Sequence, residues 1–292
     1  MAESPKRPSK AERSSSAREA ARRLHGEEQA KAKRKSLLVK LGVVGAMVVI
    51  VALVIMIVVQ NRNAEIPESG PIPQGGNEHG GIVLVSDGEG GVTVDPELTG
   101  ERTISLDDIG EPLPQGAAPE PRGVAGEEPA ESGPAEMVVY VDVNCPHCAQ
   151  FEGQYGDQLE EWVASGDIVL EYRNVAFLDG NSSTNYSSRG ANALACVADQ
   201  APTAYMDFAS ALMAQQEEEL DNAGLAALAA ENGAEGLEDC IDSGTYRPFA
   251  QATHEAAVAD AIPGTPSVWL DGEEWDMQGQ PDFAAWVGER LG

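Results

Sequence analysis

The sequence predicts an α/β domain over residues 136–292, with elements in the order strand, helix, strand, helical block, hairpin, helix. Three observations support this prediction. Residues 137–143 (MVVYVDV) form a near-continuous apolar run, which is typical of a strand buried on both faces. The next segment has apolar residues at gaps of three and four, as a helix with one buried face requires. A long helical stretch, about 186–261, follows a second strand.

Local patterns predict the elements that follow the first strand. The first helix rests on an apolar stripe made of Cys148, Phe151, Tyr155, Leu159 and Trp162. Residues 168–177 (IVLEYRNVAF) indicate the second strand, and apolar residues then recur at helical spacing through the helical block. Residues 267–270 and 274–275 suggest two short strands about a tight turn. The last helix is expected over 281–291, with Pro281 near its first turn.

Charge is distributed unevenly along the chain. The formal net charge is −29, yet residues 1–40 hold twelve Lys or Arg against five Glu. That head carries +7, and the remaining 252 residues carry −36. Such an acidic body would repel polyanions, so nucleic acid is excluded as a partner. We interpret the acidity as a contribution to solubility.

A single transmembrane helix is predicted over residues 37–60. Residues 41–59 are nineteen positions without a charge, which nearly cross a hydrocarbon core of about 30 Å. Basic residues crowd the preceding side and only Arg62 follows closely, so the N-terminus is predicted inside and the bulk of the chain outside. A cleaved signal peptide is the competing interpretation, but its apolar region is usually shorter and no convincing cleavage site follows.

The chain therefore divides into four predicted regions. Residues 1–36 resemble a basic cytoplasmic tail with no core of its own, and the transmembrane helix follows. Residues 61–135 are acidic and rich in Gly and Pro, as linkers are, although β-prone residues at 82–94 could pair as a short hairpin on the domain's sheet. The compact domain is expected at 136–292, which is long enough for a proper core.

The motif that carries chemistry is Cys145-Pro146-His147-Cys148, at the junction of the first strand and the first helix. Free backbone N–H groups and the positive end of the helix dipole stabilise an anion there, so the pKa of the Cys145 thiol should fall. Pro146 suits the first helical position because its N–H would be unpaired anyway. His147 is a second donor or cation beside that sulfur. Cys148 lies one turn on, close enough to close a disulfide, and a stabilised thiolate makes that disulfide the stronger oxidant.

Two other interpretations of the motif are weaker. A zinc site needs two more ligands, usually another close pair, whereas Cys196 and Cys240 are isolated and the four histidines form no such pair. We therefore predict no metal site, and no cofactor. A purely structural disulfide would not need placement at a helix start, so redox chemistry is the favoured reading.

The run YVDVNCPHCAQFE resembles the active-site segment of the DsbA-like branch of the thioredoxin superfamily, which commonly carries Cys-Pro-His-Cys. Residues 264–268 (GTPSV) look like that superfamily's loop with a cis-proline facing the active site. The helical block is similar to the insertion that distinguishes DsbA-like proteins from plain thioredoxin. The resemblance covers about 137–291 and implies a thioredoxin fold with a helical insertion.

The resemblance implies a role for each matching position. Cys145 would form the mixed disulfide with substrate, and Cys148 would be the buried partner that resolves it. Pro266, in the cis form, would place the Thr265 backbone beside the sulfur pair, where it can hydrogen-bond an extended substrate. Thr265 departs from the Val usual in strong oxidants, and some isomerase-type relatives carry Thr. Asp142, three residues before the first cysteine, is either a proton acceptor near the second or a solvated or capping carboxylate.

Cys196 and Cys240 lie 44 positions apart in the helical block. In an oxidising compartment we expect a structural disulfide between two helices, worth about 4 kcal/mol by loop entropy. A second redox relay is the less favoured alternative because neither cysteine has a neighbouring cysteine or basic residue. Two buried free thiols are the third reading.

The sequence thus predicts a membrane-anchored, bacterial-type dithiol oxidase that acts outside the membrane on cysteine pairs in secreted or membrane proteins. By family resemblance, a quinone-linked membrane enzyme of the DsbB or vitamin-K-epoxide-reductase (VKOR) type would reoxidise it. The first rival is a disulfide reductase or isomerase fed by a membrane electron donor. A Cys/His metal-binding chaperone using Cys145, His147 and Cys148, and a tethered adaptor with a vestigial redox centre, are the others.

Overall fold

The computed structural model describes Met47, Ile50 and residues 66–124, 133–215 and 218–292. The chain divides into two compact units, and all the elements below belong to the one that runs from Ile66 to Gly292. The predicted transmembrane segment lies almost wholly outside the described residues. No helix in the described part of the chain is long and apolar enough to cross a bilayer.

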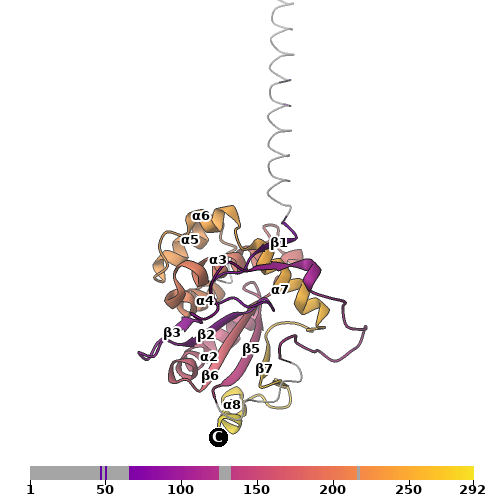
Figure 1. Ribbon diagram of the computed structural model, residues 1–292, viewed down its shortest axis with the longest axis vertical. Coiled ribbons are helices and arrows are strands. Elements are labelled where there is room, and N and C mark those ends of the chain that lie inside the picture. Colours follow the sequence, from indigo (N-terminus) through magenta and orange to yellow (C-terminus); the bar gives the residue numbers. More distant parts are fainter. Residues whose placement is uncertain (1–46, 48–49, 51–65, 125–132, 216–217) are drawn as a thin grey trace, which may run out of the picture. The chain divides into compact units, whose positions relative to one another are not determined.

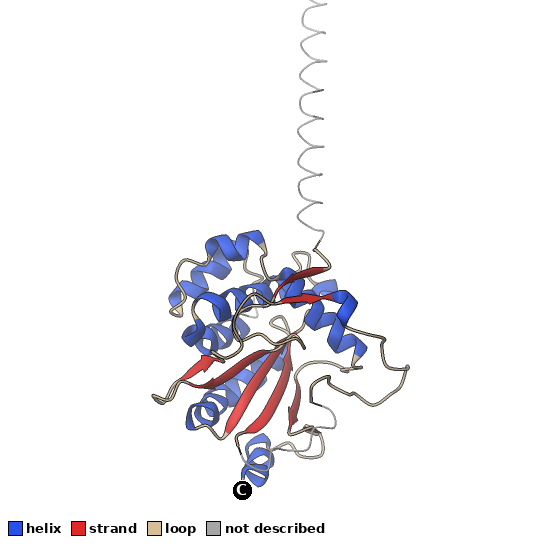
Figure 2. Ribbon diagram, viewed as in Figure 1, coloured by secondary structure: helices blue, strands red, loops and turns tan. Residues whose placement is uncertain are grey.

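A six-stranded sheet forms the centre of this unit, in the order β3-β2-β6-β5-β7-β8 (Figures 1 and 2). Its strands are β2 (Ile82–Ser86), β3 (Val92–Val94), β5 (Ala135–Val141), β6 (Ile168–Asn174), β7 (Ser267–Leu270) and β8 (Glu273–Glu274). β5 and β6 run parallel, and the other neighbours are antiparallel. The apolar run that predicted a buried strand is β5, which has strands on both sides and five consecutive buried residues at its end.

Helices cover both faces of the sheet. They are α2 (Pro146–Ser165), α3 (Tyr186–Gln200), α4 (Tyr205–Ala214), α5 (Asn222–Glu231), α6 (Glu238–Ser243), α7 (Arg247–Ala259) and α8 (Phe283–Leu291). Alternate residues of β5 divide between the two faces, because successive side chains of a strand point to opposite sides. Met137 and Val139 join the core that contains Phe151 of α2. Val138 joins a second cluster that contains Ala257 of α7.

The predicted order of elements after Ala135 is confirmed, and the helical block is resolved into five helices, α3 to α7. Figure 1 shows α3 to α6 gathered as one group at one end of the strands. Pro202 begins a short 3-10 turn, Pro202–Ala204, between α3 and α4. Gly244 ends α6 in the left-handed conformation, with φ +65°. These breaks let one helical stretch fold back on itself as a compact insertion.

The segment before β5 is more structured than its linker-like composition predicts. The expected hairpin forms from β2 and β3, and β2 pairs antiparallel with β6, so this hairpin extends the central sheet. β1 (Ser69–Pro71) and β4 (Thr103–Ser105) pair as a separate two-stranded sheet. Ile72, Leu84 and Ile104 are buried in the main core. Isolated apolar residues among many Gly and Pro therefore suffice to fold this stretch onto the domain.

Residues 106–124 complete this attachment as an extended strap along the C-terminal end of α7. The strap contains a short 3-10 turn, Leu106–Asp108. Its backbone N–H groups at Leu113 and Glu120 donate to the carbonyls of Ala259 and Asp260 at 2.9 and 3.0 Å. Arg122 forms a forked ion pair with the Asp260 carboxylate, with its shortest contact at 2.7 Å. The strap is thus held by both backbone and charge.

The predicted structural disulfide is present. Cys196 of α3 and Cys240 of α6 are bonded, with an S–S distance of 2.03 Å. Both residues are buried in the main core. The bond ties two helices of the insertion that are 44 positions apart in the sequence.

Replacing Cys196 and Cys240 together with alanine should lower the free energy of unfolding by about 4 kcal/mol, because the unfolded chain regains the entropy of a 44-residue loop. Denaturant unfolding of the full chain measures this loss. Under strong reducing conditions the wild type and the variant should become nearly equal. A difference that persists after reduction would mean that packing of the sulfur atoms, and not the crosslink, stabilises the insertion.

Candidate active site

The Cys-Pro-His-Cys motif lies where the sequence predicted, between β5 and α2. Cys145 is the N-cap of α2, and Pro146 occupies the first helical position. The cap is held by two backbone hydrogen bonds: the Cys145 N–H donates to the Asp142 carbonyl at 2.9 Å, and the Ala149 N–H donates to the Cys145 carbonyl at 3.1 Å. Cys145 and Cys148 are free thiols, and both are buried. The helix start therefore fixes the sulfur of Cys145 next to unpaired backbone N–H groups.

A loop from the far end of the domain closes the site. The peptide bond between Thr265 and Pro266 is cis, as the resemblance implied. The Cys145 Sγ lies 3.4 Å from the Thr265 carbonyl oxygen, to which it donates when the thiol is protonated, across 120 positions of sequence. The structure thus brings together both motifs that the sequence singled out.

The two sulfurs of the motif differ sharply in acidity. A hydrogen bond from Cys148 is the largest influence on Cys145; with help from the Thr265 side chain and the backbone N–H groups of Cys148 and His147, it lowers the pKa of the Cys145 thiol to about 5. Burial, and the donation of its proton to the neighbouring sulfur, raise the pKa of the Cys148 thiol far above its ordinary value. Cys145 is therefore the thiolate at neutral pH, and Cys148 is its hydrogen-bond donor.

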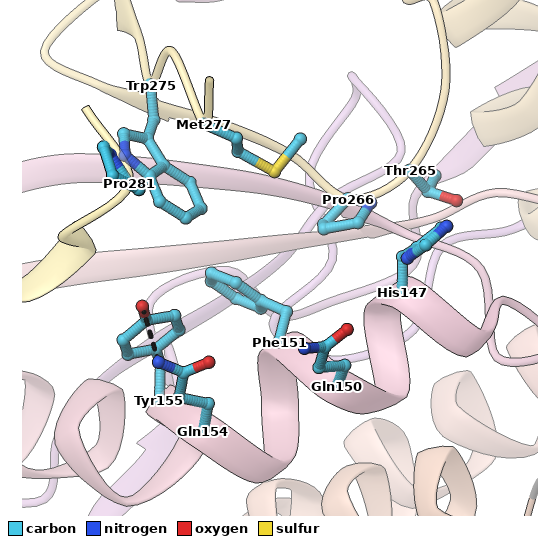
Figure 3. Close-up of a pocket in the computed structure, with 10 residues that line it drawn as sticks. All are labelled: His147, Gln150, Phe151, Gln154, Tyr155, Thr265, Pro266, Trp275, Met277 and Pro281. Carbon is cyan, nitrogen blue, oxygen red and sulfur yellow. Dashed lines mark hydrogen bonds between the residues drawn. The ribbon is translucent and has the colours of Figure 1, made fainter. Parts of the chain in front are cut away.

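His147 and Asp142 take different places around this pair. His147 is exposed, and its imidazole faces a cavity, whereas its backbone N–H supports the Cys145 thiolate (Figure 3). Asp142 is fully buried, and its two oxygens accept from the backbone N–H groups of Asn144 and Leu178, each at 2.9 Å. Burial raises the pKa of this carboxyl. Both Asp142 contacts are those of a capping carboxylate that shapes the loop before Cys145.

Beside the motif lies an open cavity of about 380 Å³. Its lining consists of His147, Gln150, Phe151, Gln154, Tyr155, Thr265, Pro266, Trp275, Met277 and Pro281. In Figure 3, His147, Thr265 and Pro266 stand at one end, and Tyr155, Trp275 and Pro281 stand at the other. Six of the ten lining residues are aromatic or apolar, and the other four are polar, so the cavity suits an apolar side chain of a polypeptide with polar groups beside it.

Sequence reasoning missed this cavity because its wall comes from two distant segments. Phe151 and Tyr155 were predicted as part of the buried stripe of the first helix. Phe151 is indeed buried, yet both side chains also face the cavity (Figure 3). Trp275 approaches them from after β8, with its ring 6.1 Å from that of Phe151. Met277 is a large apolar side chain at the surface, which often marks a contact site, but its exposure is visible only in the structure.

In the described part of the chain, no group of three His, Cys, Asp or Glu side chains is placed to hold a metal ion. A cysteine pair at a helix start, facing a cis-proline on this sheet, is the arrangement of a thioredoxin-type thiol–disulfide oxidoreductase. The family model described as thioredoxin matches residues 124–289, which is more than half of the chain. The chain therefore belongs to the thioredoxin family.

Solved structures of two thiol–disulfide oxidoreductases are similar to this chain. The chain is 34% identical to DsbA from Mycobacterium tuberculosis, covering 58% of this chain and 89% of that one, with a TM-score of 0.49. It is 30% identical to the disulfide oxidoreductase DsbG from the same organism, covering 57% and 84%, with a TM-score of 0.48.

Part of this chain is also similar to a segment of a larger protein. The chain is 33% identical over 150 residues to the serine/threonine-protein kinase PknE of M. tuberculosis, which covers 47% of this chain and 26% of the kinase. The chain thus spans about a quarter of the length of the curated relatives that it matches.

The alkylation rate of Cys145 in the reduced chain should rise with an inflection near pH 5. The pKa of Cys145 in the folded chain is below its ordinary value of 9.0, so ionisation of this thiol stabilises the reduced fold. This stabilisation is fully present above about pH 9 and is lost as the pH falls through about 5. Cys148→Ala should move the inflection to higher pH, since it removes the largest stabilising contact. Thr265→Val, which removes a weaker contact, should move it less. An inflection near pH 9 in the wild type would contradict this account.

Proposed function

We propose that this protein is an extracytoplasmic dithiol oxidase, which introduces disulfides into secreted or membrane proteins through its Cys-Pro-His-Cys centre. The observation that carries the proposal is the thiolate at Cys145, whose pKa is lowered to about 5. A stabilised thiolate is a good leaving group and favours the reduced state of the pair, so the disulfide form gives up its oxidising equivalents readily.

The proposed reaction follows from the different acidity and exposure of the Cys145 and Cys148 sulfurs. A substrate thiolate attacks the Cys145 sulfur, forms a mixed disulfide and breaks the bond to Cys148, which leaves with the electron pair. A second substrate thiolate then attacks the substrate sulfur of the mixed disulfide and expels Cys145 as its stabilised thiolate. The substrate has gained a disulfide, and the enzyme pair is left reduced. Cys145 is the attacked sulfur in this scheme because it keeps some exposure (6%), whereas Cys148 is 0% exposed.

Substrate binding is assigned to Thr265, Pro266 and the cavity. The backbone of Thr265 lies beside the Cys145 sulfur, where an extended substrate segment can pair with it. An apolar side chain next to the substrate cysteine would enter the cavity and pack on its aromatic wall, which includes Phe151 and Trp275. Backbone pairing would accept many sequences, and the apolar cavity would favour unfolded chains.

The proposed location is the outer face of a membrane, with residues 37–60 as the anchor and the N-terminus inside. The Cys196–Cys240 disulfide supports this placement, because structural disulfides persist in oxidising compartments. A single turnover leaves Cys145 and Cys148 reduced, so sustained oxidation needs an electron acceptor. We assign that role to a quinone-linked membrane enzyme of the DsbB or VKOR type.

One observation favours a second candidate, a disulfide isomerase or reductase. Thr265 stands before the cis-proline, and its side chain contributes to the stabilised thiolate. An isomerase must keep its cysteines reduced, whereas an oxidase must keep them oxidised. Alkylation trapping in cells separates the two: mostly oxidised Cys145 and Cys148 favour the oxidase.

Equilibration of the full chain with glutathione should give a reduction potential well above that of thioredoxin, about −270 mV, and toward that of strong oxidants, about −120 mV. The oxidised chain should also form disulfides in a reduced, unfolded substrate. Cys145→Ser and Cys148→Ser should each abolish this turnover, because neither variant can hold the Cys145–Cys148 disulfide that the substrate thiolate attacks. A potential near that of thioredoxin would overturn the oxidase proposal.

A further inference from the structure

Arg122 of the strap holds the residue at which α7 ends. Its guanidinium forms a fork on the Asp260 carboxylate, with Nη2 donating to Oδ1 at 2.7 Å and Nε donating to Oδ2 at 3.0 Å. The backbone N–H of Arg122 also donates to Oδ2, at 2.9 Å, and Nη1 donates to the Ile109 carbonyl. Asp260 is 5% exposed. Because a buried charge without a partner is costly, this pair fixes the strap and the helix end to each other.

The residue after Asp260 has a strained backbone. Ala261 has a φ of +57°, in the left-handed region. This conformation is less favourable for a residue with a Cβ atom than for glycine. The Ala261 N–H donates to the Val258 carbonyl at 3.1 Å, so the strained residue closes the last turn of α7. Such strain persists only where the surrounding structure holds the turn in place.

The strap contacts the chain on both sides of Ala261. On the side before it, the Glu120 N–H donates to the Asp260 carbonyl at 3.0 Å, in addition to the fork on the carboxylate. On the side after it, Ile262 is 6% exposed and packs in the cluster that contains Val124. The left-handed turn is therefore held from two sides by one short stretch of the strap.

The loop that follows this turn is short. Residues 263–266 separate Ile262 from β7 and include the cis-proline. The β7 end is fixed in the central sheet, where Ser267 pairs with Tyr140 of β5. The other end is fixed by the turn at the end of α7. Four residues have little reach to spare between two fixed ends, so the position of Thr265 depends on both.

We propose that the Arg122–Asp260 pair is a clamp that positions the cis-proline loop for the redox reaction. The clamp holds the left-handed turn at Ala261, and this turn sets the place of the Thr265 carbonyl, 3.4 Å from the Cys145 sulfur. The inference rests on the proposed function, because it assigns a positioning role in that reaction. A displacement of about 1 Å at a reacting centre can slow a reaction about a hundredfold, so a restraint at the loop's far end has a measurable effect.

The test measures oxidation of a reduced peptide with two cysteines by the full chain, with oxidised glutathione as the oxidant. Arg122→Ala should raise KM at least about fivefold and change kcat less than about twofold, because the displaced Thr265 backbone pairs poorly with the peptide. The inflection in the alkylation of Cys145 should also move to higher pH, as in Thr265→Val, because the loop supplies one of the contacts that lower the pKa of Cys145.

Arg290→Ala is the matched control. Arg290 forms a similar fork with Glu273, and its side chain is 22% exposed, against 23% for Arg122. This variant should keep KM and the alkylation inflection of the wild type. Arg122→Lys keeps the charge but not the fork, so its KM should lie between those of the wild type and Arg122→Ala, and it carries the test if Arg122→Ala does not fold. Equal effects of Arg122→Ala and Arg290→Ala would overturn the inference.

Ala261→Gly tests whether the clamp acts through the turn. Glycine adopts a positive φ without the penalty of a Cβ atom, so a turn with glycine needs less holding. Added to Arg122→Ala, this change should recover part of the lost KM although it creates no new contact. No recovery would overturn the inference. A wild type that forms no disulfide in the peptide would instead contradict the proposed function, and the alkylation profiles would still decide the clamp, since identical profiles for the wild type and Arg122→Ala would overturn it.

Discussion

The hydrogen bond from Cys148 to the Cys145 sulfur is the interaction on which the active site depends. It is the largest influence that lowers the pKa of Cys145, and it exists only because the two residues are one helical turn apart. β5 delivers the chain to the start of α2, and Cys145 caps that start. The helix therefore provides both the donor sulfur and the free N–H groups that hold the anion.

The same arrangement makes the two cysteines unequal in access as well as in acidity. Cys145 keeps a small exposed fraction at the start of α2, while Cys148 is fully buried in the core cluster that contains Tyr172. Attack from outside can reach only one sulfur, and this gives the exchange a defined order. The cost of the arrangement is a buried sulfur that must gain and lose its proton away from solvent.

Sequence reasoning reached the parts of this site that depend on local spacing. The helix-start cysteine, the cis-proline loop and the hairpin at 82–94 follow from short motifs, and the structure contains all three. The sequence predicted that backbone N–H groups and the helix dipole lower the pKa of Cys145. In the structure the hydrogen bond from the Cys148 side chain lowers this pKa more than the backbone N–H groups do. The cavity depends on contacts between distant segments, and an apolar stripe on a helix carries no sign of it.

The segment before β5 shows how a linker-like composition can still position the chemistry. Arg122 and Asp260 are 138 positions apart, so no local sequence pattern predicts their ion pair. Asp260 directly follows α7 and lies five residues before Thr265, whose carbonyl oxygen contacts the Cys145 sulfur. The strap therefore restrains the helix end from which the cis-proline loop departs. β2 covers the edge of β6 that would otherwise be left unpaired. Residues 66–124 are in this sense part of the catalytic unit, because they hold in place both the sheet and the loop that meet at Cys145.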